Sequence, residues 1–172
     1  MRIVPLFAGL VLAGCATSQM DNATEVATAK LYRGDGSEAG VAKLVRKSDG
    51  ISLEIAAPAP GQGSFGMHLH AVGKCDGPDF SSAGPHWNPA GKQHGHDNPA
   101  GAHAGDFPNL VSNAEGRILF NGPVESAGWE GEGALFDADG VAVVIHEKAD
   151  DYKTDPSGNS GKRIYCGVFT RG

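Results

Sequence analysis

Apolar and polar residues alternate over several short segments of the chain, the pattern of β-strands with one buried face. Residues 63–70 show it clearly, because Phe65, Met67 and Leu69 fall on one face and His68 and His70 on the other. Asp-Gly pairs separate the first three segments and favour tight hairpins. The predicted strands are 27–33, 40–47, 51–56, 63–70, 117–120, 133–136, 141–146 and 164–170.

About eight short strands joined by turns, with no helical periodicity, predict an all-β fold. We expect a Greek-key antiparallel β-sandwich or flattened barrel with long loops. Residues 73–108 differ from the rest, because they are rich in Gly, Pro, Asn and His and have little apolar periodicity. A segment of this length without secondary structure is uncommon in a compact domain unless it is functional, and a bound metal could hold it in place.

Composition and charge narrow the possible partners. The 172 residues fit one hydrophobic core, and 26 glycines agree with many turns. A net charge of −6 argues against nucleic acid as the main partner, since phosphate contacts need clustered Lys and Arg. After the start of the chain no apolar run is long enough to cross a membrane, so no internal span is predicted.

The first residues have the pattern of an export signal. Arg2 precedes an uncharged run that ends in Leu12-Ala13-Gly14-Cys15, which resembles a bacterial lipobox. We therefore predict a lipoprotein signal peptide over 1–14, a lipid on Cys15, a flexible tether over 15–26 and a domain over 27–172. The alternative is a plain secretory signal with a coincidental cysteine. Lipidation implies a protein anchored to the membrane of a bacterial cell envelope, and the lack of Asp after Cys15 favours the outer membrane.

Two cysteines remain, Cys75 and Cys166. An even pair in an oxidising compartment favours a disulfide, with two free buried thiols as the alternative.

Histidines carry the candidate chemistry, since all seven lie between positions 68 and 146. His68 and His70 leave the same strand face and could bind one metal, although exposed strand faces also carry His by chance. His146 ends an apolar strand, where a lone His is more often structural. Three further histidines and one carboxylate make up a tetrahedral zinc set or, alternatively, a solvated polar loop: His86, His94, His103 and Asp106.

Taken together, these motifs resemble the copper/zinc superoxide dismutases. The likeness runs from about residue 27 to 170, with several motifs in the same order. The matching segments are Gly-Met-His-Leu-His at 66–70, Ser-Ala-Gly-Pro-His-Trp-Asn-Pro at 82–89, His-Glu-Lys-Ala-Asp-Asp at 146–151 and Gly-Asn-Ser-Gly-Lys-Arg-Ile-Tyr-Cys-Gly at 158–167.

The resemblance implies dismutation of superoxide by bound copper and zinc. Arg163 would guide the anion, and Asp150 would hydrogen-bond a ligand of each metal. Cys75 and Cys166 match the family disulfide, and a homodimer stays open. His86 would bridge the two metals as an imidazolate and take up a proton. The implied copper ligands are His68, His70, His86 and His146, and the implied zinc ligands are His86, His94, His103 and Asp106.

Some features depart from the family pattern. His96 matches no ligand and is either a solvated loop residue or an accessory metal site. The lysines that steer the substrate are not fixed by the motifs, and Lys148, Lys153 and Lys162 are candidates. A metal-holding envelope lipoprotein without catalysis is the alternative function. A zinc hydrolase is poorly supported, because the sequence has no His-Glu-x-x-His.

Overall fold

Short antiparallel strands make up nearly all the regular structure of residues 23–124 and 134–172, the part of the chain that the computed structural model describes. The helical structure in this part is one 3₁₀ turn, η1 (Ser81–Ala83). The strands are β1 (Thr24–Arg33), β2 (Glu38–Lys47), β3 (Gly50–Pro58), β4 (Ser64–Phe65), β5 (Met67–His70), β6 (Leu110–Val111), β7 (Arg117–Val124), β8 (Ala142–His146), β9 (Arg163–Val168) and β10 (Thr170–Arg171).

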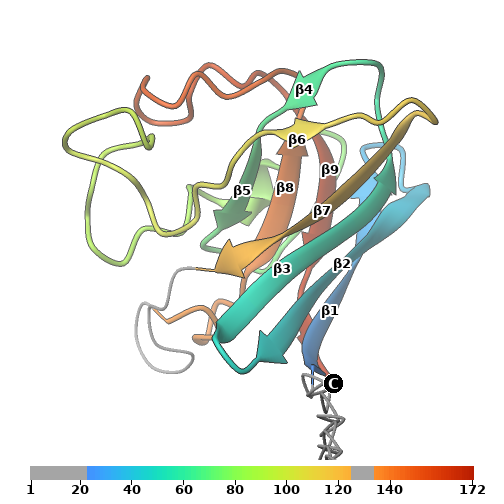
Figure 1. The fold of residues 1–172 in the computed structure, drawn as a ribbon, viewed down its shortest axis with the longest axis horizontal. Helices are drawn as coiled ribbons and strands as arrows, with labels where there is room; N and C mark the ends of the chain where they lie inside the picture. Colours follow the sequence, from blue (N-terminus) through green and yellow to red (C-terminus); the bar gives the residue numbers. More distant parts are fainter. Residues whose placement is uncertain (1–22, 125–133) are drawn as a thin grey trace, which may run out of the picture.

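Eight strands form one sheet, which curls into a half-barrel (Figure 1). Its order is β5-β8-β9-β1-β2-β3-β7, with β10 paired to β1, and every pair is antiparallel. The chain passes from β3 to β5 and from β7 to β8, so two connections cross from one end of this order to the other. These crossings are of the Greek-key kind. The predicted all-β class is confirmed.

The concave side of the sheet holds the main core. In β3 every second residue is buried, and Leu53 and Ile55 belong to one core cluster with Leu31 of β1, Leu44 of β2 and Leu69 of β5. Burying one such side chain contributes about 1.5–3 kcal/mol. A smaller cluster lies on the other side of β8 and β9, where Phe80, Ala83, Ala142, Val144 and Cys166 pack together. The loop that carries η1 is therefore anchored to the convex face of the sheet.

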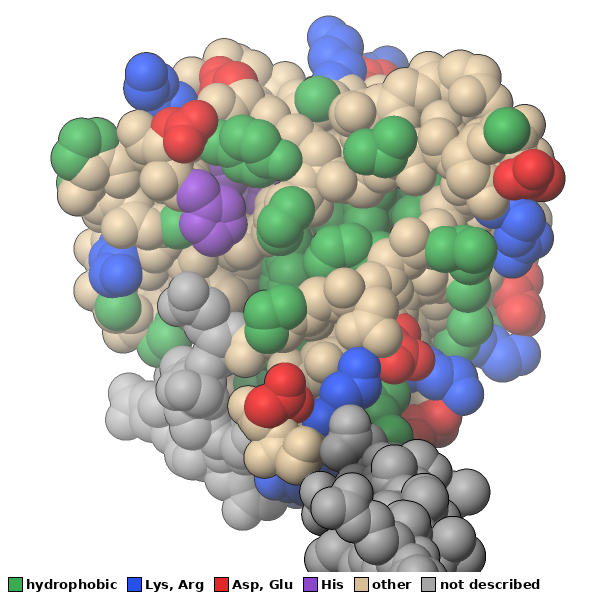
Figure 2. All heavy atoms as spheres, viewed as in Figure 1, with side chains coloured by type: hydrophobic (Ala, Val, Ile, Leu, Met, Phe, Trp, Pro, Cys, Tyr) green, Lys and Arg blue, Asp and Glu red, His purple; other side chains and the backbone are tan. Residues whose placement is uncertain are grey.

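The surface over β6 and β7 is partly apolar. Val111 is 63% exposed and Leu119 is 65% exposed. Figure 2, drawn from the same side as Figure 1, shows hydrophobic side chains across the middle of this face and charged side chains mainly round its margin.

Several predicted strand boundaries are wrong. The predicted strand 63–70 is two strands, because the chain turns away at Gly66, whose N–H bonds the Lys148 carbonyl at 2.7 Å. β1 begins at Thr24 rather than at 27. The predicted strand 164–170 begins one residue earlier and is interrupted at the buried Phe169, which separates β9 from β10.

The predicted strand 133–136 is absent from its described residues, 134–136, which form a turn. Ala134 and Leu135 are consecutive and both buried, so the segment lacks the alternation of a half-buried strand. β7 in turn runs past 120 to Val124 in spite of Pro123. β7 is an edge strand of the sheet, which is where proline is tolerated within a strand.

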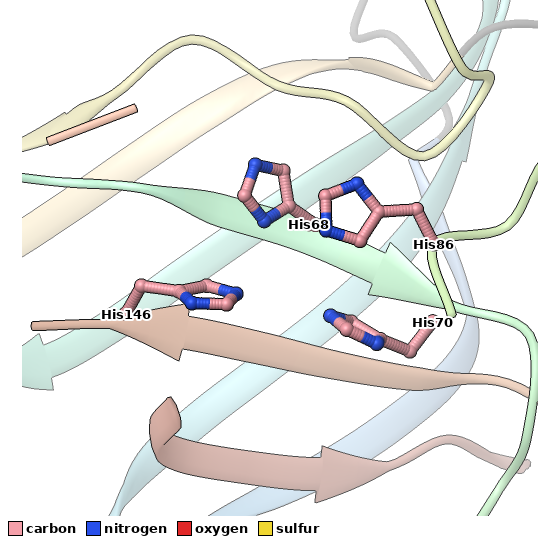
Figure 3. A group of neighbouring side chains, drawn as sticks. All are labelled: His68, His70, His86 and His146. Carbon is pink, nitrogen blue, oxygen red and sulfur yellow. The ribbon is translucent and has the colours of Figure 1, made fainter. Parts of the chain in front are cut away.

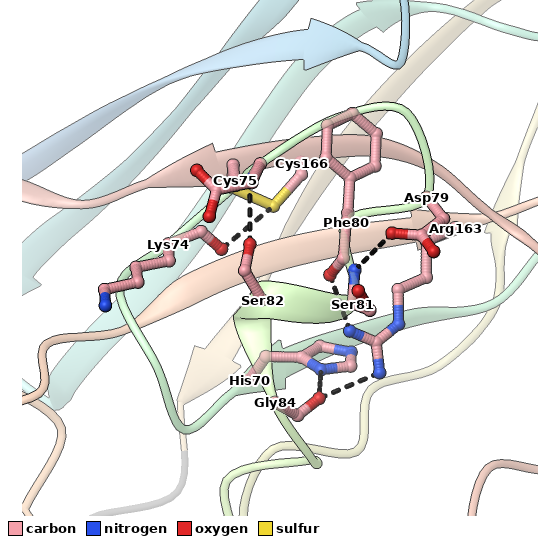
Figure 4. The surroundings of a disulfide bond; sticks show 11 residues. His70, Lys74, Cys75, Asp79, Phe80, Ser81, Ser82, Gly84, Arg163 and Cys166 are labelled. Carbon is pink, nitrogen blue, oxygen red and sulfur yellow. Dashed lines mark hydrogen bonds between the residues drawn. A yellow bond between two sulfur atoms is a disulfide. The ribbon is translucent and has the colours of Figure 1, made fainter.

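The disulfide between Cys75 and Cys166 is confirmed, with the two Cα atoms 5.7 Å apart across 91 residues of sequence (Figure 4). It ties the loop after β5 to β9. The predicted signal peptide, Cys15 and most of the predicted tether lie outside the described residues. Over 23–124 and 134–172, no helix is long and apolar enough to cross a membrane.

Candidate metal centre

Four buried histidines from three parts of the chain face one another (Figure 3). His68 and His70 come from β5, and His146 ends β8. The register pairs His68 with Val144 and His70 with Ala142, so His146 lies on the same sheet face one step further along. An isolated bridge between His70 and His86 brings in the fourth ring. We call these residues the four-histidine set.

Each ring in the four-histidine set has one nitrogen engaged and one free. Nδ1 of His70 bonds the Gly84 carbonyl at 2.9 Å, and Nδ1 of His146 bonds the Gly161 carbonyl at 3.2 Å. The buried nitrogens without a hydrogen-bond partner are His68 Nδ1, His70 Nε2, His86 Nε2 and His146 Nε2. The four residues each offer a ligand atom within 4.8 Å of the others. Unpaired buried nitrogens are costly, and a transition-metal ion that prefers imidazole would satisfy all four at once.

A second set of ligand atoms adjoins the first and is centred on Asp106. Its Oδ1 lies 2.9 Å from Nδ1 of His86, 3.1 Å from Nδ1 of His94 and 3.2 Å from Nδ1 of His103. Nδ1 of His103 and Nδ1 of His86 are 3.3 Å apart. Zinc bonds of about 2.0 Å in a tetrahedron place ligand atoms about 3.3 Å apart, so this spacing fits zinc. We call these four residues the Asp106 set.

His86 belongs to both sets. Its Nδ1 faces the Asp106 set and its Nε2 is one of the free nitrogens of the four-histidine set. Its ring stacks on His68 with ring centres 3.9 Å apart. His68 also lies within reach of the Asp106 set, but its Nε2 is already held by Asp150 at 2.6 Å. We therefore take His103, through its Nδ1 contacts with His86 and Asp106, as the fourth member of the Asp106 set, and the allocation of copper and zinc to the two sets stays a prediction.

Asp150 contacts one histidine of each set through its carboxylate. Its Oδ2 contacts Nε2 of His68 at 2.6 Å, and its Oδ1 contacts Nε2 of His94 at 3.0 Å. Sequence reasoning missed the residues that hold Asp150 itself. Asn109 bonds both the N–H and the carbonyl of Asp150, and Tyr152 donates its N–H to the Asp150 carboxylate at 2.7 Å. No motif in the sequence marked these two residues.

Burial favours the neutral form of some histidines, and nearby carboxylates favour the charged form of His94. Burial lowers the pKa of His68 to about 3 and the pKa of His146 to about 4. Burial also disfavours charge on His94, but its bonds to Asp106 and Asp150 outweigh this and raise the pKa of His94 to about 9. Burial raises the pKa of both carboxyls, but the bonds from His86 and His94 hold the pKa of Asp106 well below its usual range, and the bonds from His68 and His94 do the same for Asp150. The four-histidine set thus favours neutral nitrogen ligands, and the Asp106 set favours a cation.

An open cavity of about 670 Å³ leads to both sets, and its lining includes His86, His103 and His146. Arg163 lines it too, held by its bonds to the carbonyls of Phe80 at 2.7 Å and Gly84 at 2.8 Å (Figure 4). Burial lowers the pKa of Arg163, but a guanidinium stays charged at neutral pH. The cavity thus carries a fixed positive charge beside the four-histidine set.

The structure adds Lys92 to the candidate cations near the cavity. Lys92 lines the cavity, whereas Lys148 and Lys153 are not among its described lining residues. Lys162 lines a separate, neighbouring depression. Asn88 accepts the Lys92 N–H at 3.0 Å and donates to the Lys92 carbonyl at 2.8 Å, so the backbone at this lysine is fixed. Sequence reasoning missed Lys92 because its direction depends on how the loop folds.

His96 belongs to neither set. It is exposed, its Nε2 contacts the Asp106 carbonyl at 3.2 Å, and its ring centre lies 6.2 Å from that of Tyr152. These contacts favour the loop role for His96 over an accessory metal site.

The fold and the two adjoining sets define an all-β protein with two clusters of side chains that could each hold a metal ion, and His86 belongs to both clusters. A family model described as copper/zinc superoxide dismutase matches residues 38–169, and the chain belongs to this family of oxidoreductases.

Relatives agree with this assignment. The chain is 43% identical over 136 residues to superoxide dismutase [Cu-Zn] 1 of Aquifex aeolicus, covering 77% of this chain and 80% of the relative. It is 43% identical over 145 residues to the superoxide dismutase-like protein YojM of Bacillus subtilis, covering 81% and 74%. The crystal structure of a superoxide dismutase-like protein from Bacillus subtilis superposes with a TM-score of 0.79 at 39% identity, covering 84% of this chain and 99% of that one.

Proposed function

We propose that the chain catalyses the dismutation of superoxide at a copper/zinc site in a bacterial cell envelope. Two superoxide anions and two protons give one oxygen molecule and one hydrogen peroxide molecule. The observation that carries the proposal is the convergence of four unpaired buried nitrogens beside a cavity that Arg163 lines. A closed metal-storage site would need the nitrogens but not a cation facing an open cavity.

The donor chemistry assigns the two metals. The four-histidine set suits copper, because nitrogen ligands serve both of its oxidation states. The Asp106 set, with three nitrogens and one carboxylate oxygen at tetrahedral spacing, suits zinc. When bound, copper supplies the one-electron oxidation and reduction of the substrate, and zinc supplies fixed positive charge.

The residues of the chain supply orientation, charge and a proton. The two carbonyls that Arg163 bonds hold its guanidinium in the cavity wall, where it attracts and positions the anion. His86 keeps Nδ1 in the Asp106 set while its Nε2 is free to take up a proton and pass it to the reduced substrate. Asp150 fixes the tautomers of His68 and His94.

The experiment compares metal-loaded protein with the same protein stripped of metal. Protein loaded with copper and zinc should consume superoxide and produce peroxide at a rate far above the stripped protein. His146→Ala removes one copper ligand and serves as the matched control, and it should lose most of the activity. Equal rates for loaded and stripped wild-type protein would contradict the proposed activity.

The envelope location rests on the lipobox-like residues 12–15. Cleavage before Cys15 would leave a lipid-bearing cysteine on a tether that enters the domain at β1. We expect mass spectrometry of a bacterial membrane fraction to find an acylated N-terminus at Cys15, and a Cys15→Ser variant to lack it. Mature protein that retains residues 1–14 would contradict the anchoring.

A further inference from the structure

A second carboxylate, Asp155, reaches the Asp106 set from the loop between β8 and β9. Its Oδ1 accepts a hydrogen bond from the backbone N–H of His94 at 2.7 Å. The same oxygen lies 3.9 Å from Nε2 of His103. One carboxylate thus bonds His94 and lies near His103, although it is 61 residues from His94 in the sequence.

The contact with His103 completes a pattern around the Asp106 set. His94 and His103 both present Nδ1 to Asp106, so Nε2 is the ring nitrogen of each that can contact another group. Nε2 of His94 contacts Asp150, and Nε2 of His103 faces Asp155. A metal-bound neutral imidazole carries its proton on the far nitrogen, and a carboxylate facing that proton orients the ring and strengthens the ligand.

The two carboxylates differ in their surroundings. The side chain of Asp150 is 1% exposed, whereas that of Asp155 is 51% exposed and lines the cavity. At 3.9 Å the attraction between Asp155 and His103 is electrostatic rather than a hydrogen bond, and water screens part of it. The bond to the His94 N–H is the stronger of its two contacts.

Hydrogen bonds within the loop before Asp155 hold the backbone that carries this carboxylate. Asp151 accepts hydrogen bonds from the N–H groups of Lys153 and Thr154 at 2.9 and 2.8 Å, and from Asn159 at 2.9 Å. A further backbone bond joins the loops directly, since the Asp97 N–H bonds the Tyr152 carbonyl at 2.9 Å. Asp155 thus extends an existing contact between the two loops into the Asp106 set.

We infer that Asp155 is a positioning residue for zinc, which latches the loop 86–106 to the loop 147–162 and orients His103 from the solvent side. This inference rests on the proposed zinc site. The substitution of residues that support metal ligands in this way typically weakens metal binding by about 10- to 100-fold. Because Asp155 is half exposed, we expect the lower end of that range.

The test measures zinc affinity of copper-free protein by competition with a chromophoric chelator. Asp155→Ala removes both contacts and should weaken zinc binding about tenfold. Asp155→Asn keeps an acceptor for the His94 N–H but removes the charge that faces His103, so its affinity should fall between Asp155→Ala and wild type. Co²⁺ bound in place of zinc should show an altered visible spectrum in Asp155→Ala, because the orientation of His103 changes.

Asp137 provides the matched control. It lines the same cavity, and its carboxylate accepts a bond from the nearby Asp139 N–H at 3.0 Å. Asp137→Ala and Asp137→Asn change the net charge equally and should leave zinc affinity unchanged. Asp155→Ala binding zinc as tightly as Asp137→Ala would overturn the inference, and if Asp155→Ala failed to fold, the two Asn variants would decide it. Wild-type protein that bound no zinc would overturn the zinc site itself, which is a different result.

Discussion

Hydrogen bonds decide which ring nitrogen each histidine offers to a metal. His70 and His146 donate Nδ1–H to backbone carbonyls and keep Nε2 free, whereas His68 is held at Nε2 and keeps Nδ1 free. The sequence spacing alone does not choose between these atoms. The hydrogen bonds therefore fix the tautomer of each of these histidines. Single substitutions can then separate the roles of the two proposed metals.

We expect Asp106→Ala and His68→Ala to have opposite effects. Asp106→Ala removes a proposed zinc ligand and the acceptor of the Gly95 and His103 N–H groups, so the free energy of unfolding should fall by about 2 kcal/mol or more, while some activity remains. His68→Ala removes a proposed copper ligand and should abolish most activity with a smaller loss of stability. Thermal unfolding and superoxide consumption measure the two effects, and equal effects of both variants on both quantities would show that the metals are misassigned.

Arg163 should act by charge as well as by position. Its charge faces a substrate anion on a chain of net charge −6, and salt screens that attraction over about 8–10 Å. Arg163→Ile should slow the reaction about tenfold or more and weaken its salt dependence. Arg163→Lys should keep part of the rate, because it keeps the charge but loses the geometry that bonds two carbonyls.

Lys92 and Lys153 provide the comparison in the same assay of rate against ionic strength. Lys92→Gln should lower the rate less than Arg163→Ile, and Lys153→Gln should leave it nearly unchanged, since only Lys92 of these two lines the described cavity. If Arg163→Ile and Arg163→Lys were equally slow, charge would not be the property that matters.

Two long loops and a disulfide hold the site against the sheet. The Cys75–Cys166 bond anchors the loop whose carbonyls at Phe80 and Gly84 orient Arg163 and His70 (Figure 4). Closing a loop of 91 residues is worth at most about 4–5 kcal/mol in the chain-entropy model. The loop between β8 and β9 also approaches the proposed metal ligands, at Gly158.

Gly158→Ala should damage this loop and the zinc site together. Gly158 has φ of +62°, and an added Cβ would overlap the Asp150 carboxylate and lie 2.7 Å from Nε2 of His94. Gly36→Ala is the matched control, because Gly36 has φ of +83° with nothing within 4 Å of the added Cβ. The control should cost about 1 kcal/mol from backbone strain, and Gly158→Ala clearly more, with weaker zinc binding. Equal melting temperatures and zinc affinities would mean that the contact at Gly158 does not constrain the site.

For the whole molecule, the buried histidines make stability depend on pH when no metal is bound. The pKa values of His68 and His146 are lowered to about 3 and 4. Their contribution to the free energy of unfolding is therefore fully present above about pH 6.5 and is lost as the pH falls through 4 and 3. The pKa of His94 is raised to about 9, so its contribution is fully present below about pH 6.5 and is lost as the pH rises through 9.

The metal-free protein should therefore be most stable near pH 6.5 and less stable on both sides, as measured by denaturant unfolding across the pH range. In the metal-loaded protein the decline between about pH 6.5 and 9 should disappear, because zinc then occupies the nitrogen of His94 that held the extra proton. Metal-free protein whose stability kept rising up to pH 9 would show that His94 is not charged between Asp106 and Asp150.

The order of residues was enough to predict the fold class and the candidate ligands. Alternation of apolar and polar residues depends on the two-residue period of a strand, which any local window shows. It also placed His68 and His70 on one face. The same local view failed at 133–136, where the apolar residues of the described part, 134–136, form a turn, and at Gly66, where a carbonyl from a distant loop ends a strand.

Only the tertiary structure decided how the loops meet. Lys92 lines the cavity while Lys148 and Lys153 do not, Asn109 and Tyr152 hold Asp150, and Asp155 reaches His94 and His103. Apart from the bond between Tyr152 and Asp150, which are two residues apart, these facts depend on how segments tens of residues apart come together, and no period or motif in the sequence indicates them. Such contacts depend on the path of a folded loop, because side-chain direction there follows individual backbone angles rather than a repeating pattern.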